Sequence, residues 1–293
     1  APGEGEHAGG WASIGPDIFA MIVSPLLEEL AGAYPSSMAT RPSSGAEPVL
    51  YGWEEVAGRS HAGQQAASLR LVCRRWRAHL DPLITAISAP ADSPGPTGGW
   101  GEAARRFPGL EHLSVVSGCG ARGAEDAAAA ALLFSRLSSL AITCEGMGDT
   151  CAAALAPLAP RLRSLRLSAG RARGGDRDML SRGGVGDPGV ISGLACMERL
   201  QSLDISGSEV GADGLRAISG LGHLEVLRIQ WCQRVGDEGL RSVARGCPAL
   251  REVYVDGCWG AGDDGVCALT QKPGLEVLHA SGVLGRFAFA RGG

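Results

Sequence analysis

The side chains of this 293-residue chain that could do chemistry are its nine cysteines and six histidines. Such groups hold zinc when they come in close pairs such as Cys-x-x-Cys, and a cysteine beside a histidine can act as a nucleophile. No Cys-x-x-Cys pair occurs, and the histidines are scattered without metal-ligand spacing. No pair of carboxylates stands out as an acid–base pair. We therefore predict that the chain is not an enzyme and that it holds no metal or cofactor.

Phosphate binding is the other chemistry that short motifs could indicate. Residues 184–189 spell Gly-x-Gly-x-x-Gly, which binds dinucleotides where it follows a strand and opens a helix. Here the motif carries Pro188 and coincides with a turn that recurs along the chain, so we favour a structural turn. A Walker-type loop needs Lys directly after its second Gly, and the only lysine, Lys272, follows Gln271.

Composition narrows the function classes further. The chain has 31 acidic and 27 basic residues, whereas nucleic-acid binders normally carry a basic surplus. No apolar run approaches the roughly 18 residues of a membrane span, and residues 1–10 lack the apolar core of a signal peptide. Nine cysteines, an odd number, fit a reducing compartment. We expect a cytoplasmic or nuclear protein that binds neither nucleic acid nor membrane. Because residue 1 is Ala and not Met, the natural N-terminus can lie upstream.

Regularly spaced leucines divide the second half of the chain into repeats. Residues 224–232 read Leu-x-x-Leu-x-Ile-x-x-Cys, and residues 250–258 repeat this pattern with Val at both inner aliphatic positions. The repeats begin at Leu110, Leu137, Leu162, Leu200, Leu224, Leu250 and Leu275. One interval is longer than the others, which places an inserted loop near residues 171–184. We also expect a degenerate first repeat at 83–109, interrupted by a Pro- and Gly-rich stretch at 88–101.

A second signature follows each expected strand. It reads Val-Gly-Asp-Glu-Gly-Leu at residues 235–240 and Ala-Gly-Asp-Asp-Gly-Val at residues 261–266. Gly permits the turn, and we predict that Asp caps the helix that follows by accepting a backbone N–H. The cysteine at the end of each strand, such as Cys232 or Cys258, is predicted to be a small buried hydrophobe that hydrogen-bonds weakly.

These features together resemble the cysteine-containing subtype of leucine-rich repeats over residues 83–282. The resemblance implies an α/β leucine-rich-repeat solenoid, in which a curved parallel β-sheet is covered by outer helices. The physical argument agrees, because each unit has one apolar strand and one half-apolar helix and buries them only by stacking on its neighbours. We expect strands to start near the seven leucines.

The segment before the repeats contains two amphipathic stretches. Residues 69–77 read Leu-Arg-Leu-Val-Cys-Arg-Arg-Trp-Arg, and residues 14–26 carry a second apolar stripe. They resemble the closing and opening parts of an F-box, although Ile14 and Gly15 replace the usual Leu and Pro. We therefore expect a disordered N-terminus at 1–12, an F-box-like helical module at 13–82 interrupted by a loop-rich insertion at 27–65, and a C-terminal tail at 283–293. The resemblance assigns adaptor binding to Ile14, Asp17, Ile18, Ile22, Leu26, Leu69, Val72 and Trp76.

An F-box followed by these repeats is the architecture of substrate receptors in SCF-type cullin–RING ubiquitin ligases. The resemblance implies that the F-box binds the Skp adaptor and that the repeats hold a protein substrate, with the chain as a monomer within a hetero-complex. Two alternatives stay open: a non-catalytic scaffold in a cytoskeletal or ciliary axoneme assembly, and an activator of a small GTPase. The insertion could cover the adaptor-binding face. The excess of Arg over Lys indicates a GC-rich genome, such as that of a green alga.

Alternation along each strand predicts the substrate surface, because the residues between the leucines face the open side of the sheet. We expect His112 and Ser114 on that face. The residues predicted to bind substrate are Arg166, Asp204, Arg228, Gln230, Trp231, Tyr254, Asp256 and His279. Trp231 and Tyr254 are predicted as anchors on adjacent strands beside Arg228, since these residue types are enriched at binding hot spots. One alternative is that these side chains have no binding role, since any solenoid exposes some side chains on this face. The other is that the partner binds to the loop at 171–184.

Overall fold

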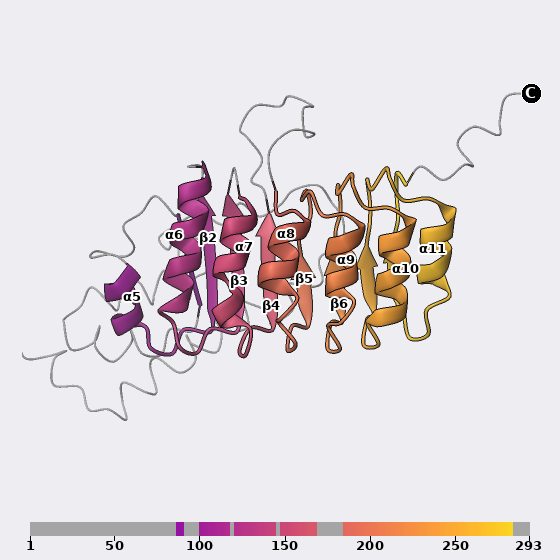
Figure 1. Cartoon of the computed structure of the whole chain (residues 1–293). Coiled ribbons are helices and arrows are strands. Elements are labelled where there is room, and N and C mark those ends of the chain that lie inside the picture. The colour runs from indigo at the N-terminus through magenta and orange to yellow at the C-terminus, as the bar shows by residue number, and fades with distance from the viewer. Residues whose placement is uncertain (1–85, 91–99, 118–119, 145–146, 169–183, 284–293) are drawn as a thin grey trace, which may run out of the picture.

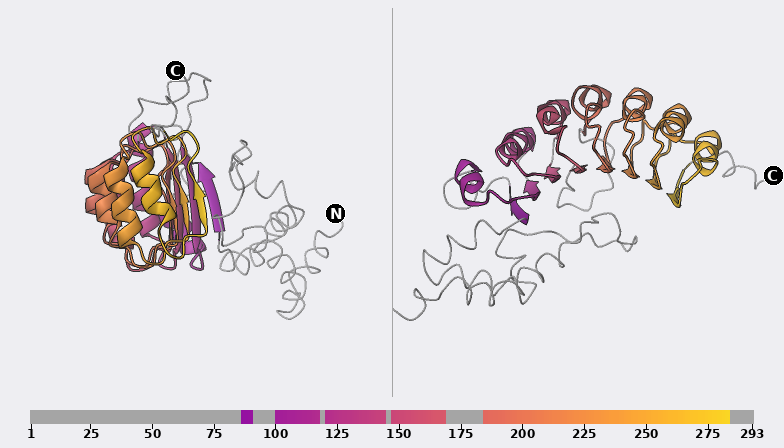
Figure 2. Two further views of the ribbon diagram at one scale, coloured as in Figure 1. Left: turned by 90° about the vertical axis from the view of Figure 1, so that its right-hand side faces the viewer. Right: turned by 90° about the horizontal axis from the view of Figure 1, so that it is seen from below.

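The computed structural model describes residues 86–90, 100–117, 120–144, 147–168 and 184–283. Their strands form one sheet in the order β1 to β8, and each strand runs parallel to the next. The helices lie along the outer side of a curved arc and the strands along its inner side (Figures 1 and 2). The predicted solenoid is therefore confirmed. Among the described residues, no helix has both the length and the apolar character required to cross a bilayer.

Each repeat contributes one strand, and β1 to β7 are each followed by one or two helical segments. The strands are β1 (Ala86–Pro90), β2 (His112–Ser117), β3 (Ser139–Cys144), β4 (Ser164–Ser168), β5 (Ser202–Asp204), β6 (Val226–Arg228), β7 (Glu252–Tyr254) and β8 (Val277–His279). The helical segments are α5 (Trp100–Arg106), α6 (Gly120–Leu132), α7 (Asp149–Ala154), η2 (Ala156–Leu158), α8 (Asp187–Gly189), η3 (Val190–Leu194), α9 (Ala212–Ile218), α10 (Asp237–Gly246) and α11 (Asp263–Thr270).

Strands β2 to β8 each begin two residues after the leucine that starts the repeat. That leucine closes the turn that leaves the preceding helix; the N–H of Leu224, for example, bonds the carbonyl of Leu221. The predicted first repeat is present as β1 and α5, but its predicted interruption at 88–101 is wrong at both ends. Residues 88–90 belong to β1, and α5 already begins at Trp100.

Several predicted segments fall outside the described residues. They are the N-terminus at 1–12, the F-box-like module at 13–82 with its insertion at 27–65, the loop at 171–184 except Gly184, and the tail at 283–293 except Val283. These boundaries remain predictions.

The core is a ladder of aliphatic side chains that the parallel register stacks one above the other. Leu113, Leu140, Leu165, Leu203, Leu227 and Val253 pair from strand to strand and are all buried. Such a ladder stabilises each repeat only through its neighbours. The last member, Leu278, is partly exposed because no described repeat follows it.

The cysteines at the strand ends join the repeats, and the prediction that they are buried is confirmed. Cys232 and Cys258 are completely buried. The Cys258 Sγ lies 2.9 Å from the carbonyl oxygen of Ile229, and the Cys232 Sγ lies 3.3 Å from that of Ile205. Each thiol thus donates to the repeat before it. Burial raises the pKa of Cys258 to about 12 and that of Cys232 to about 11, so both stay protonated donors at neutral pH.

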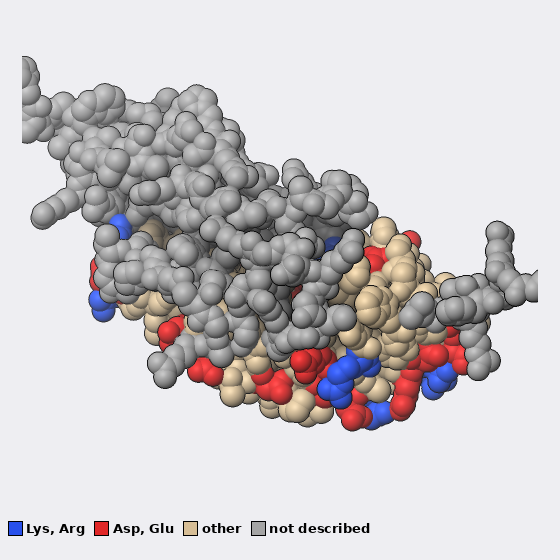
Figure 3. Space-filling view, turned by 90° about the horizontal axis from the view of Figure 1, so that it is seen from above, with Lys and Arg blue, Asp and Glu red and all other residues tan. Residues whose placement is uncertain are grey.

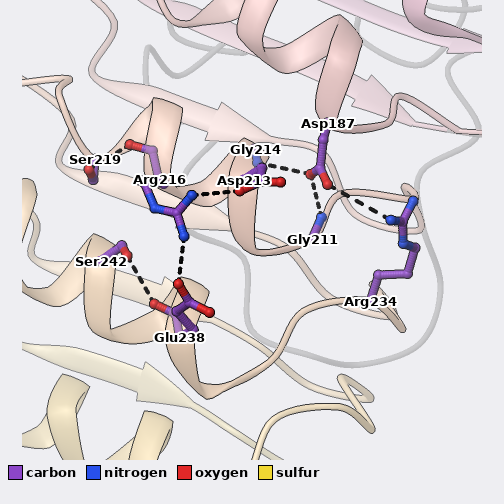
Figure 4. A network of polar contacts seen from close by, with 9 residues as sticks. All are labelled: Asp187, Gly211, Asp213, Gly214, Arg216, Ser219, Arg234, Glu238 and Ser242. Atoms are coloured by element: carbon purple, nitrogen blue, oxygen red, sulfur yellow. Dashed lines mark hydrogen bonds and ion pairs between the residues drawn. The ribbon is translucent and has the colours of Figure 1, made fainter.

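The aspartates of the Gly-Asp signature do not cap their own helices, so that prediction is wrong. Asp187 is the first residue of α8 rather than its N-cap, which is Gly186, and no side chain caps that helix. Its Oδ1 instead accepts the backbone N–H groups of Gly211 and Gly214, at 2.6 and 2.9 Å, which open the helix of the following repeat (Figure 4). A Cβ on Gly214 would lie 2.6 Å from that oxygen. The second glycine of the signature therefore makes room for the carboxylate.

The same contact recurs elsewhere, and we call these aspartates the Asp ladder. Asp149 Oδ1 accepts the N–H of Gly186 at 2.7 Å. Asp237 Oδ1 accepts those of Gly262 and Gly265 at 2.6 and 3.0 Å. The ladder is broken at Ala212, which holds the equivalent first position of α9 and has no carboxylate to offer α10.

Restoring the ladder should stabilise the protein. We expect Ala212→Asp to raise the free energy of unfolding by about 1 kcal/mol, because the new carboxylate would accept N–H groups at the start of α10. Denaturant unfolding measures the change. The matched control is Ala217→Asp, inside α9, where no such donors are available. Equal or lower stability of Ala212→Asp would contradict this explanation of the ladder.

Candidate protein-interaction surface

One row of polar and aromatic side chains crosses the open face of the sheet. The strand register pairs Arg166 with Asp204, then Asp204 with Arg228, Arg228 with Tyr254, and Tyr254 with His279. The residues on either side of Arg166 in its strand are buried leucines, as the alternation predicts. The five residues are therefore brought together as expected, and we call them the central row.

Three neighbouring pairs within the central row are in contact. Arg166 Nε lies 2.9 Å from Asp204 Oδ2 in an ion pair. The Arg228 guanidinium carbon lies 4.4 Å from the centroid of the Tyr254 ring. The rings of Tyr254 and His279 stack with centroids 4.8 Å apart and an interplanar angle of 8°. These contacts hold the side chains in place before any partner arrives, which lowers the entropy cost of binding.

Glu252 lies two residues before Tyr254 in β7 and supports this row, a role that the sequence did not indicate. Its Oε2 accepts the hydroxyl of Tyr254 at 3.1 Å and lies 3.9 Å from Arg228 Nη2. Burial, followed by this hydrogen bond, raises the pKa of Tyr254, which keeps the hydroxyl a donor. The Arg228 side chain is only 11% exposed. Arg228 therefore positions Tyr254 and offers a partner little surface of its own.

Gln230 and Asp256 lie beyond the strand ends and tie the last repeats together. Gln230 Nε2 donates to Asp256 Oδ2 at 2.6 Å, and the N–H of Ser281 donates to Asp256 Oδ1 at 2.7 Å. Of the N-terminal positions, Ser114 lies in line with the central row but is separated from it by Ala141. His112 belongs to the neighbouring row of serines and does not join the site.

Trp231 does not stand beside Tyr254 on the sheet, so that part of the prediction is wrong. Strand β6 ends at Arg228, and the alternation ends with the turn that follows. Trp231 has a φ of 61°, alone among the described residues other than glycine in having a positive φ. This left-handed conformation costs a bulky residue about 1 kcal/mol or more. The indole lies across Gly257 in the next turn, where an added Cβ would be 2.8 Å from its Cδ2.

A second exposed tryptophan, Trp259, lies in that next turn and also escaped the sequence analysis. Trp231 is 49% exposed and Trp259 is 46% exposed. The alternation rule could not select Trp259, because it applies to strands and Trp259 lies outside them. The available signal was two tryptophans in the loops that follow two adjacent strands, in a chain with only 5% aromatic residues.

Comparison with known proteins agrees with this geometry. A family model described as "Leucine Rich repeat" matches residues 199–219 and 223–244, which hold β5, α9, β6 and most of α10. These two segments of the chain are therefore similar to leucine-rich repeats. Such repeats are protein-interaction repeats. The predicted adaptor-binding residues between Ile14 and Trp76 lie outside the residues that the structure describes.

Solved structures of low sequence identity are also similar to the chain. An internalin from Listeria monocytogenes is 16% identical with a TM-score of 0.43, and the match covers 73% of this chain and 59% of the internalin chain. The complex of Rad7 and Elc1 from yeast matches at 14% identity and a TM-score of 0.37, covering 89% of this chain and 80% of that chain. No curated protein matches the chain.

Proposed function

We propose that this leucine-rich-repeat protein is the substrate-recognition subunit of an SCF-type cullin–RING ubiquitin ligase. The observation that carries the proposal is the F-box-like sequence at residues 14–26 and 69–77 directly before the solenoid. In this role the chain binds the Skp adaptor through that module and a protein substrate through the repeats. It is not itself an enzyme, and it acts in the cytoplasm or nucleus.

The central row supports the receptor role physically. Its side chains come from five adjacent strands, so one partner segment laid across the sheet meets several of them at once. The Arg166–Asp204 ion pair and the stack of Tyr254 on His279 fix their positions. A preformed surface of this kind favours recognition of a folded or extended protein over that of a small molecule.

Co-purification with the Skp adaptor tests the proposal. The wild-type chain should bring down purified adaptor, and Ile18→Arg should abolish this by placing a charge in the apolar stripe that the F-box resemblance assigns to the adaptor. Ile191→Arg is the matched control, because Ile191 is exposed on the outer side of the solenoid. It should bind like wild type.

Failure of the wild-type chain to bind adaptor would contradict the ligase role and favour the scaffold alternative in a cytoskeletal or ciliary assembly. A reconstituted ubiquitin-transfer reaction offers a second readout. Lys272 is the only lysine of these 293 residues, and it is only 9% exposed. Ubiquitin should therefore be found on the bound partner and not on the receptor.

A further inference from the structure

Trp231 occupies a position that the fold assigns to glycine. The equivalent residues in three other repeats are Gly207, Gly257 and Gly282, with φ values of 72°, 71° and 71°. Glycine adopts this conformation without the steric penalty that a tryptophan meets. The large side chain therefore does not serve the turn, and half of it faces solvent. Strain of this kind is a reason to look for a function at the residue.

We call Trp231, Gly257 and Trp259 the tryptophan rim. The Trp231 indole covers Gly257, and the exposed Trp259 follows two residues later in the loop after β7. The patch lies at the edge of the sheet where the strands end and the chain turns toward the helices, the edge that Figure 3 views. It is thus separate from the central row, which crosses the middle of the open face.

The surroundings of the tryptophan rim are acidic. The segments 205–214, 229–239 and 255–265, which join β5, β6 and β7 to their helices, contain seven carboxylates and one arginine, Arg234. Three of the carboxylates pair with arginines. Asp213 and Glu238 pair with Arg216, and Asp264 pairs with Arg241.

The other four carboxylates have no arginine within 4.0 Å among the described residues. They are Glu209, Asp237, Asp256 and Asp263, of which Asp237 and Asp256 accept uncharged N–H groups. Asp256 lies directly beside the rim, because its carbonyl accepts the N–H of Trp231 at 2.8 Å. Figure 3 shows acidic and basic side chains interspersed along the helical side of this edge. The three segments around the two indoles carry a net negative charge, because they hold seven carboxylates and one arginine.

We propose that the tryptophan rim binds a basic segment of a partner protein. An arginine or lysine of the segment lies on the exposed indole of Trp231, and the net negative charge of the three surrounding segments balances its charge. Tryptophan is the best aromatic partner for such a cation. Opposite charge around the patch also steers the segment to the site. The inference deepens the proposed function by naming the substrate class, and it rests on that function only in calling the partner a substrate.

Selection from a displayed library of random short peptides, on the purified full chain without adaptor, tests the inference. Peptides enriched on the wild type should be rich in Arg and Lys and poor in Asp and Glu. Trp231→Gly removes the indole and places at this position the residue that the turn prefers, so this variant should fold at least as well. The best selected peptide should bind it at least about tenfold more weakly, and added salt should weaken wild-type binding.

Leu133→Gln is the matched control, because Leu133 is equally exposed at 51% but lies after α6, far along the solenoid. It should bind the selected peptides like wild type. Enrichment of acidic peptides, no enrichment at all, or equal binding to Trp231→Gly would each overturn the inference. The adaptor is absent from this experiment, so the two tests are independent. A negative peptide selection would not contradict adaptor binding, and a failure to bind adaptor would not contradict peptide binding at the tryptophan rim.

Discussion

Gly193→Ala should lower the free energy of unfolding by about 3 kcal/mol. Gly193 lies in η3 against α7 of the preceding repeat, and a Cβ there would overlap the carbonyl group of Ala152 and lie 2.8 Å from the nitrogen of Ala153. These are backbone atoms of a helix, so no side chain can rotate to make room. The two helical segments would have to separate, and the buried side chains between them would lose contact.

Chemical denaturation followed by circular dichroism measures this loss. Gly220→Ala is the matched control, since a Cβ there would meet its nearest neighbour, the oxygen of Ala217, only at 3.8 Å. That variant should stay within about 0.5 kcal/mol of wild type. An unchanged midpoint for Gly193→Ala would show that α7 and η3 do not approach this closely in solution.

The leucine spacing was sufficient to predict the solenoid, because the repeat determines which residues form strands and how those strands pair. A residue such as Leu227 must be buried between neighbouring strands, so its recurrence specifies parallel strands, their number and their order. The same alternation placed Arg166, Asp204, Arg228, Tyr254 and His279 on one face. The contacts between these side chains, and the contacts of Glu252 with Tyr254 and Arg228, depend on side-chain conformations that the spacing of residues does not specify.

The predictions that failed depended on geometry between repeats. The capping rule predicts that Asp187 accepts an N–H group of its own helix, α8. Its carboxylate instead accepts N–H groups of the next repeat, about 25 residues later in the chain. Likewise, the alternation along β6 does not extend to Trp231, because the strand ends at Arg228 and Trp231 lies in a turn with a positive φ. The presence of glycine at the equivalent position of three other repeats was visible in the sequence and could have indicated this turn.

Asp237→Ala should lower the free energy of unfolding by about 2 kcal/mol. The Oδ1 of Asp237 accepts two N–H groups at the start of α11, and hydrogen bonds to a charged acceptor are worth about 1.5–3 kcal/mol each. Water can replace part of this loss because the carboxylate is only partly buried. The removed contact joins two repeats, so the transition should also become less steep as the last repeats unfold before the others.

Asp263→Ala is the control that separates a contact between repeats from an effect on the local helix. Asp263 holds the same first-turn position in α11, but no described helix follows for its carboxylate to reach. If the aspartates acted on their own helices through the helix dipole, both variants would lose similar stability. If they act on the next repeat, Asp263→Ala should stay within about 0.5 kcal/mol of wild type. Equal losses in the two variants, measured by the same denaturant unfolding, would contradict the Asp ladder.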